Sequence, residues 1–88
     1  MLSFEYDENK SKQNLAKHGI DFDVAQSLWD DPSMLELPSK KATTETRLLV
    51  IGIINQKHWS VIITYRGKNI RIISVRRSRI DEVNFYES

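Results

Sequence analysis

The sequence contains no cysteine and only two histidines, His18 and His58, which stand forty residues apart. The absence of cysteine excludes a disulfide and any zinc site that uses thiolate ligands. With so few histidines, a metal centre would need mostly carboxylate ligands. We therefore expect chemistry that uses neither a metal nor another cofactor.

Long apolar segments are also missing. No apolar run approaches the roughly 18 residues needed to span a bilayer, and the start of the chain lacks the basic and then apolar layout of a secretion signal. We expect a cytoplasmic protein. The 88 residues, of which 40% are hydrophobic, suffice for one modest core, so we expect a single domain over residues 1–88.

Acidic residues are absent from one long segment. Between Glu45 and Asp81 the chain has eight basic residues and no acid, although the net charge of the whole chain is only +1. All six arginines lie in this segment: Arg47, Arg66, Arg71, Arg76, Arg77 and Arg79. Their counter-charges must come from the acidic first half of the chain, from water or from an external anion such as a nucleic acid. In the alternative interpretation, the acidic and basic halves simply attract one another in the folded protein.

The first half of the chain predicts a strand followed by two helices. Residues 2–6 alternate like a short strand, and a polar helix then begins after Asp7 and ends at Gly19. Asp21 can cap a second helix that ends at Asp31-Pro32. Its core face is predicted to carry Phe22, Ala25, Leu28 and Trp29. Residues 32–46 show no clear period and predict a loop or a ragged edge segment.

The second half predicts an antiparallel meander and a terminal helix. Three β-rich runs cover residues 47–54, 58–66 and 69–77 and are joined by hairpin-length connections. Ser78, followed three residues later by Asp81, predicts a capped helix with Ile80, Val83 and Tyr86 on its apolar side. The fold class is therefore α+β, with a short strand, two helices, a three-stranded meander and a last helix.

The hairpin turns predict which side chains meet. A two-residue turn at Gly67-Lys68 places Arg66 opposite Asn69 and Thr64 opposite Arg71. A second such turn at Gln56-Lys57 would place Arg47 opposite Arg66, with Glu45 on the same face. Under both turns, Glu45, Arg47, Arg66 and Arg71 converge.

Alternation along the last strand separates its two final arginines. Arg77 is predicted to share the face of Arg71, and Arg76 to point to the opposite face. There Arg76 could bond the terminal helix, the second helix or a partner.

The predicted cluster suits RNA cleavage without a metal. That reaction requires activation of a 2′-hydroxyl, stabilisation of charge on a pentacoordinate phosphate and protonation of the leaving oxygen. Glu45 with Arg47 and Arg71 can supply the first two functions, and Tyr65 or His18 could assist with protons. In the alternative interpretation, basic residues on a small sheet guard its edges against aggregation, and His18 caps the end of a helix.

Six segments, in order along the chain, form a combined pattern: Phe4-Glu5-Tyr6-Asp7, residues 14–22, Asp31-Pro32, Glu45-Thr46-Arg47, residues 70–77, and residues 82–86. This pattern resembles the BrnT family of toxins over nearly the whole chain. The resemblance implies a ribonuclease of a type II toxin–antitoxin pair with a fold similar to RelE-type toxins. It also implies a ribbon-helix-helix antitoxin that binds DNA, so that DNA is contacted only through the antitoxin.

Three functions fit the sequence. The first is a metal-independent endoribonuclease toxin that inhibits translation and growth; the others are a non-catalytic nucleic-acid-binding module and a subunit that only holds an acidic partner segment. We favour the first function. We also expect two toxins per antitoxin complex, because hydrophobic strands and a dense arginine face would otherwise be left exposed on so small a domain. The predicted catalytic residues are Glu45, Arg47, Arg71, His18 and Tyr65, and the predicted RNA contacts are Lys17, Arg66, Arg76 and Arg77.

Overall fold

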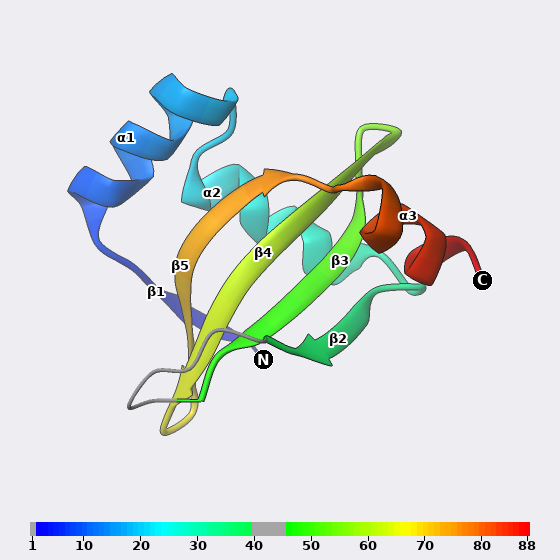
Figure 1. The fold of residues 1–88 in the computed structure, drawn as a ribbon. Coiled ribbons are helices and arrows are strands. Elements are labelled where there is room, and N and C mark those ends of the chain that lie inside the picture. Colours follow the sequence, from blue (N-terminus) through cyan, green and yellow to red (C-terminus); the bar gives the residue numbers. More distant parts are fainter. Residues whose placement is uncertain (1, 40–45) are drawn as a thin grey trace.

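A computed structural model describes residues 2–39 and 46–88 (Figure 1). The elements, in chain order, are β1 (Ser3–Glu5), α1 (Glu8–His18), α2 (Phe22–Ala25), the 3-10 helix η1 (Gln26–Asp30), β2 (Leu35–Pro38), β3 (Leu48–Ile54), β4 (Lys57–Arg66), β5 (Asn69–Arg77) and α3 (Ile80–Glu87). The strands form one sheet in the order β1-β5-β4-β3-β2. β1 runs parallel to β5, and the other neighbours are antiparallel. The predicted α+β class and the meander are confirmed.

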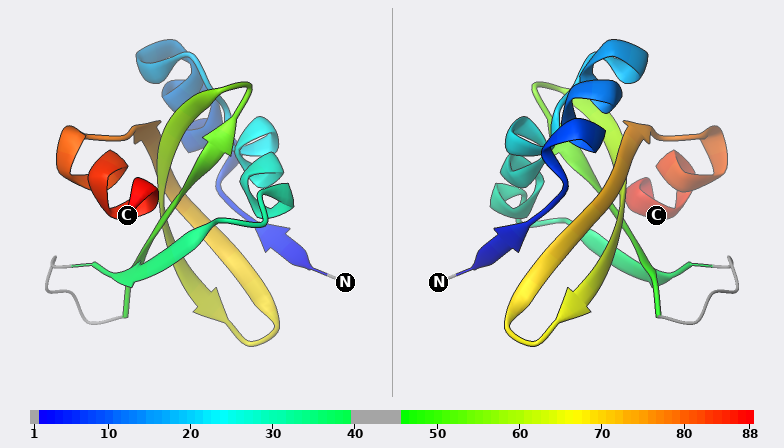
Figure 2. Two further views of the ribbon diagram at one scale, coloured as in Figure 1. Left: turned by 90° about the vertical axis from the view of Figure 1, so that its right-hand side faces the viewer. Right: turned by 90° about the vertical axis from the view of Figure 1, so that its left-hand side faces the viewer.

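The sheet has two different faces. α1, α2 and η1 lie on one face, and α3 lies on the other, as the two views of Figure 2 show. The face under α1 and α2, here called the inner face, carries the apolar core, which includes Val61 and Ile63 of β4. The opposite face, here called the outer face, carries the alternate residues of the same strand: Ser60, Ile62 and Thr64. In the described part of the chain, no helix is long and apolar enough to cross a membrane.

Helix α1 begins and ends where the sequence predicts. The Asp7 carboxylate accepts hydrogen bonds from the backbone N–H groups of Asn9 and Lys10, and Gly19 ends the helix at φ 77°, a left-handed conformation that glycine adopts without strain. The buried Asn14 side chain donates to the carbonyl of Val75 at 2.9 Å and accepts from its N–H at 3.2 Å. Asn14 thereby satisfies the edge of β5 beyond the reach of β1.

The second helix is shorter than predicted. The Asp21 carboxylate caps it by accepting from the N–H of Val24 at 2.8 Å, as predicted, but the α-helix ends at Ala25 and continues as the 3-10 helix η1. Its predicted core residues Phe22, Ala25 and Leu28 are buried. The predicted core residue Trp29 is only partly buried, and its ring lies 5.0 Å from that of Phe4, centroid to centroid, in an edge-to-face contact.

The segment predicted as a loop or ragged edge contains a strand. β2 pairs with β3 at the edge of the sheet, with Leu37 opposite Leu49. Glu45 and the rest of residues 40–45 lie outside the described residues.

The predicted turn at Gln56-Lys57 is wrong. Asn55 and Gln56 form the turn with φ values of 50° and 69°, and Ile54 pairs with Lys57. Two successive positive φ values match the twist of the flanking strands, which is why tight hairpins use them. Leu48 consequently lies opposite Ile63, and this register directs Arg47, the preceding residue, toward Thr64 and not toward its predicted partner Arg66, two residues further along β4. A shift of two residues preserves which face each side chain occupies.

A bulge in β5 overturns the prediction for the last two arginines. Ile62 pairs with Ser74 and Ile63 with Ile72, so one extra residue of β5 interrupts the ladder. An extra residue reverses the alternation beyond it. Arg76 therefore lies opposite Ser60 on the outer face, and Arg77 lies opposite Trp59 on the inner face. The predicted pairs Thr64 with Arg71 and Arg66 with Asn69 are confirmed.

The terminal helix is capped one residue later than predicted. Arg79 is its N-cap residue, and the Glu82 carboxylate accepts from the Arg79 N–H at 2.8 Å. Val83 and Tyr86 are half-buried as part of the predicted apolar stripe. Ile80 is 76% exposed, so its predicted place in that stripe is wrong.

Candidate nucleic-acid interface

A groove of about 550 Å³ lies on the outer face between β2 and α3. Its floor comes from β3, β4 and β5, and its described lining is Leu37, Pro38, Ser39, Arg47, Leu49, Ile62, Ile73, Ser74, Arg76, Arg79, Asp81, Glu82 and Phe85. The floor is therefore largely aliphatic, and the charged groups of the lining are three arginines and two carboxylates, those of Asp81 and Glu82. Such a groove can hold an anionic chain with guanidinium groups directed at its phosphates.

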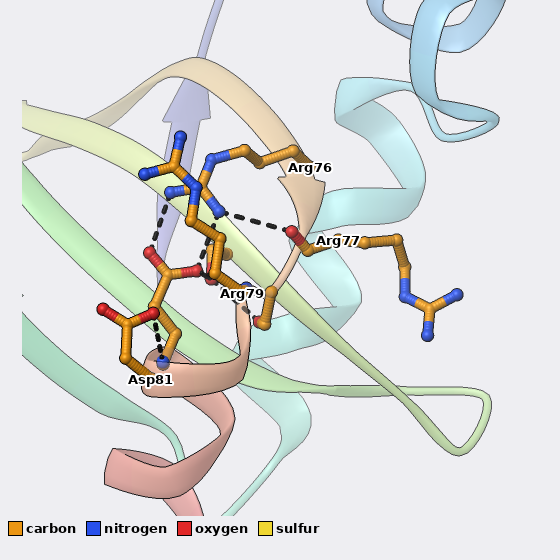
Figure 3. Close-up of polar contacts among 7 residues, drawn as sticks. Arg76, Arg77, Arg79 and Asp81 are labelled. Carbon is orange, nitrogen blue, oxygen red and sulfur yellow. Dashed lines mark hydrogen bonds and ion pairs between the residues drawn. The ribbon is translucent and has the colours of Figure 1, made fainter.

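Arg76 is fixed in this groove by Glu82. Its Nη1 and Nη2 donate to Oε1 and Oε2 of Glu82 at 2.7 and 2.8 Å, in the fork geometry that Figure 3 shows. The Ser60 hydroxyl also donates to Glu82 Oε1, at 2.8 Å. The hydrogen bonds from Arg76 lower the pKa of Glu82 to about 2, although its burial acts in the opposite direction. Glu82 is therefore an ionised anchor for Arg76 and is too weak a base to accept a proton near neutral pH.

Arg79 and Arg77 point in different directions. Figure 3 shows the Arg79 side chain on the same side as that of Arg76, with Arg77 directed away from both. The Arg77 guanidinium carbon lies 5.5 Å from the centroid of the Trp59 ring in a cation–π contact. The structure thus brings Arg79 to the groove, a residue that the sequence argument left unassigned, and it removes Arg77 from the groove.

Arg71 lies on the same outer face, beyond the groove. Its Nη1 donates to Oε2 of Glu5 at 2.9 Å, and Asn69 donates to Oε1 at 3.0 Å. The hydrogen bond from Asn69 and then that from Arg71 lower the pKa of Glu5. Glu5 is a carboxylate of the outer face that the sequence analysis did not predict. Glu5 could have been predicted only from the parallel pairing of β1 with β5, because this pairing places Glu5 beside Arg71.

Arg47 and Arg66 complete the basic outer face. The Thr64 hydroxyl donates to the carbonyl of Thr46 at 2.7 Å, which holds the chain just before Arg47 beside β4. Thr64 also lies opposite Arg71, so Arg47 and Arg71 flank the same residue from β3 and β5. Arg66 is exposed near the end of this face, and its charge helps to lower the pKa of Glu5. The predicted partner of these arginines, Glu45, is outside the described residues.

The predicted proton carriers lie elsewhere. Lys17 and His18 are in the last turn of α1, which packs on the inner face. Tyr65 is half-exposed, and its hydroxyl donates to Glu36 at 2.9 Å on the inner side of the sheet. Burial and then this hydrogen bond raise the pKa of Tyr65. The structure therefore does not bring Lys17, His18 or Tyr65 to the groove.

Metal ligands do not gather in the described part of the chain. Among residues 2–39 and 46–88, no three acidic or histidine side chains are grouped as a metal site requires. His58, the second histidine, has its Nε2 at 3.1 Å from the Glu87 carboxylate and its ring edge-to-face with Tyr86.

Comparison with known proteins identifies the family. The family described as ribonuclease toxin, BrnT, of type II toxin-antitoxin system matches residues 6–82. No curated protein matches the chain. Because the match covers most of the sequence, the chain belongs to the BrnT family of ribonuclease toxins, and the family implies an antitoxin partner. The predicted family is confirmed.

Proposed function

We propose that this protein is a metal-independent endoribonuclease toxin that cleaves RNA in the outer-face groove and thereby inhibits translation and growth. The observation that carries the proposal is the convergence of Arg47, Arg76 and Arg79 in one groove, in a chain of a ribonuclease toxin family. Guanidinium groups held in place before the reaction stabilise the charge that develops on the phosphate in the transition state. The proposed substrate is RNA. Because translation takes place in the cytoplasm, we expect the protein to act there.

The proposed reaction is attack of a 2′-oxygen on the adjacent phosphorus. The 2′-oxygen–phosphorus bond forms and the phosphorus–5′-oxygen bond breaks, which leaves a 2′,3′-cyclic phosphate and a 5′-hydroxyl. Glu45 takes the 2′-hydroxyl proton, and Arg47 and Arg79 bind the phosphate oxygens. The 5′-oxygen takes its proton from water, because His18 and Tyr65 lie on the inner side of the sheet.

Arg71 and Arg66 extend the binding surface for the flanking phosphates. Both lie on the outer face, and Arg71 is oriented by Glu5. We expect the affinity of this surface to depend little on the RNA sequence, because guanidinium contacts to phosphates position a nucleic acid without reading its bases.

The proposed fold relationship is to RelE-type toxins, on the basis of an antiparallel meander with two helices on one face. The proposed partner is a ribbon-helix-helix antitoxin, with two toxins per complex and with DNA bound only by the antitoxin. A symmetric assembly of this kind would give each toxin an equivalent place. Co-expression with the neighbouring gene product, followed by mass measurement of the complex, tests this assembly.

The deciding experiment incubates the purified protein with single-stranded RNA in excess EDTA and identifies the new ends. We expect cleavage that leaves a 2′,3′-cyclic phosphate and a 5′-hydroxyl. The Glu45→Gln variant should bind RNA as well as the parent or better, because it removes a negative charge, while its cleavage rate falls by about a hundredfold or more. Loss of cleavage in EDTA, or products with a 3′-hydroxyl, would contradict the metal-independent reaction. Full activity of a folded Glu45→Gln variant would remove Glu45 as the base.

A further inference from the structure

Helix α3 carries an exposed aromatic ring on the wall of the groove. Phe85 is 58% exposed and takes no part in the apolar core. It lines the groove together with Arg76 and Arg79, and it also lines a second, more open hollow together with Asp81, Asn84 and Ser88. A single exposed apolar side chain is ordinary on a protein surface. The position of this one beside two guanidinium groups is what calls for an explanation.

The ring is held on an anchored helix. Glu82, three residues before Phe85, is bound by Arg76 at 2.7 and 2.8 Å. The hydroxyl of Tyr86, the next residue, donates to Oδ2 of Asp31 at 2.7 Å. Phe85 is thus presented between two fixed contacts, so a ligand that packs on the ring would not need to order the helix first.

Phe85 has no aromatic neighbour in the described part of the groove. Among the described residues that line it, Phe85 is the only aromatic one, and Leu49, Ile62 and Ile73 contribute aliphatic surface to its floor. Single-stranded RNA is recognised chiefly through unstacked bases that pack on aromatic side chains, with the backbone held by basic groups. The groove has both parts of this arrangement, one ring and a set of arginines.

We propose that Phe85 is a stacking platform for one unpaired base of the RNA, next to the phosphate bound by Arg79. The inference rests on the proposed function and extends it, because it assigns a base-binding position to a groove so far defined by its charge. It also fixes the direction in which the RNA leaves the arginines, toward α3. Duplex RNA cannot use this platform, since its bases are already stacked.

The test measures the affinity of a short single-stranded 2′-O-methyl oligonucleotide, which cannot undergo the 2′-hydroxyl attack. Phe85→Leu keeps an apolar side chain and removes the π face, and we expect it to weaken binding by about tenfold. Phe85→Trp should bind as well as the parent or better. Ile80→Ala is the matched control, because Ile80 is an exposed apolar residue of the same helix that does not line the groove. It should leave the affinity unchanged.

A second arm identifies the base itself. Oligonucleotides with an abasic site at successive positions are bound to the parent and to Phe85→Leu. At one position the loss caused by the abasic site and the loss caused by Phe85→Leu should fail to add, because both remove the same contact.

The outcomes separate this inference from the proposed function. If the parent binds and cleaves RNA while Phe85→Leu retains its full affinity, the stacking proposal fails and the proposed function stands. If the variant instead loses only its antitoxin, Phe85 belongs to a protein interface and the stacking proposal also fails. If the parent neither binds nor cleaves RNA, the proposed function fails, and the stacking proposal that rests on it fails as well. Thermal melting of each variant is the control for folding, and we expect these exposed substitutions to leave the melting temperature close to that of the parent.

Discussion

The two faces of the sheet are built from the same strands and meet opposite requirements. On the inner face, Val61, Ile63 and Val75 are completely or almost completely buried against α1, α2 and η1. On the outer face, the intervening positions hold Ser60, Thr64 and Arg76, and the groove remains open to solvent. The inner face supplies the apolar burial that drives folding. The outer face holds charged groups that are costly to leave unpaired, so its fixed contacts are ion pairs that position arginines.

The outer face also differs along its own length. At one end Arg71 is bound by Glu5, and at the other end Arg76 is bound by Glu82. The Glu5 pair is about 30% exposed at each partner, whereas Glu82 is 9% exposed. Solvent weakens an exposed pair. Of the two carboxylates, Glu82 is therefore the one whose loss should affect stability measurably.

The largest expected effect tests whether stability resides on the inner face. Leu28→Ala removes a fully buried side chain that lies against Gly52, where a Cβ atom would come within 2.9 Å of the Leu28 Cγ. We expect a loss of about 3 kcal/mol in the free energy of unfolding, measured with urea. Leu49→Ala on the outer face is the matched comparison and should cost about 1 kcal/mol, because Leu49 lines an open groove. Equal losses would abolish the contrast between the faces.

The second effect tests the Glu82 anchor through pH. The pKa of Glu82 is about 2 in the folded protein and 4.5 as its ordinary value. Because the folded pKa is the lower one, the unfolded chain binds a proton first as the pH falls. The contribution to stability is therefore complete above pH 4.5 and is lost between pH 4.5 and 2, and it amounts to on the order of 3 kcal/mol.

The measurement compares unfolding free energies of the parent and Glu82→Gln across that pH range. Glu5 also has a lowered pKa and contributes to the acid dependence of both proteins, so the difference between them isolates Glu82. We expect this difference to shrink as the pH falls toward 2. A constant difference would show that Glu82 acts by shape and hydrogen bonding alone.

The third effect tests whether function resides on the outer face. Arg79→Ala removes a guanidinium group from the groove and should lower the single-turnover rate of RNA cleavage by about a hundredfold, equivalent to about 2.7 kcal/mol. Arg77→Ala removes the same group two residues earlier, where it lies over Trp59 on the inner face, and should leave the rate close to that of the parent. If Arg77→Ala lowered the cleavage rate more than Arg79→Ala, the RNA would bind on the inner face and the proposed outer-face site would be wrong.

The smallest effect is on salt dependence. Loss of Arg79 should reduce the slope of log affinity against log salt by slightly less than one unit, the value for one phosphate contact. Loss of Arg77 should leave the slope unchanged. Filter binding of the 2′-O-methyl oligonucleotide over a series of salt concentrations gives both slopes. Identical slopes for the two variants would mean that the charge acts without a defined contact.

Local sequence signals predicted most of the elements and part of the site. The caps at Asp7, Gly19 and Asp21 and the turn at Gly67-Lys68 are where the sequence placed them. Each of these signals acts through hydrogen bonds or φ preferences within a few residues. The pairing of Thr64 with Arg71 followed because only one short turn separates them.

The predicted facing of the site residues was less accurate far from the turn that sets the strand register. Arg77 was assigned to the wrong face because a one-residue bulge near Ile73 gives no distinct sequence signal. The turn before β4 was misplaced because Asn55-Gln56 lacks the glycine that usually marks such turns. The family resemblance did not depend on these details, so it was correct while the geometry was partly wrong.

The sequence by itself determined the α+β class, both ends of α1, the start of α2, the hairpin at Gly67-Lys68 and the family, because each rests on local preferences or on a pattern of residues in order. Only the tertiary structure decided which groups face one another across the sheet. Glu5 meets Arg71 although 66 positions separate them along the chain. Arg76 bonds Glu82 of the terminal helix, which was one of its three predicted partners, but it does so from the outer face and not from the face that was predicted. Such contacts depend on every intervening turn and register, and a single inserted residue reverses the side on which a strand's side chains lie.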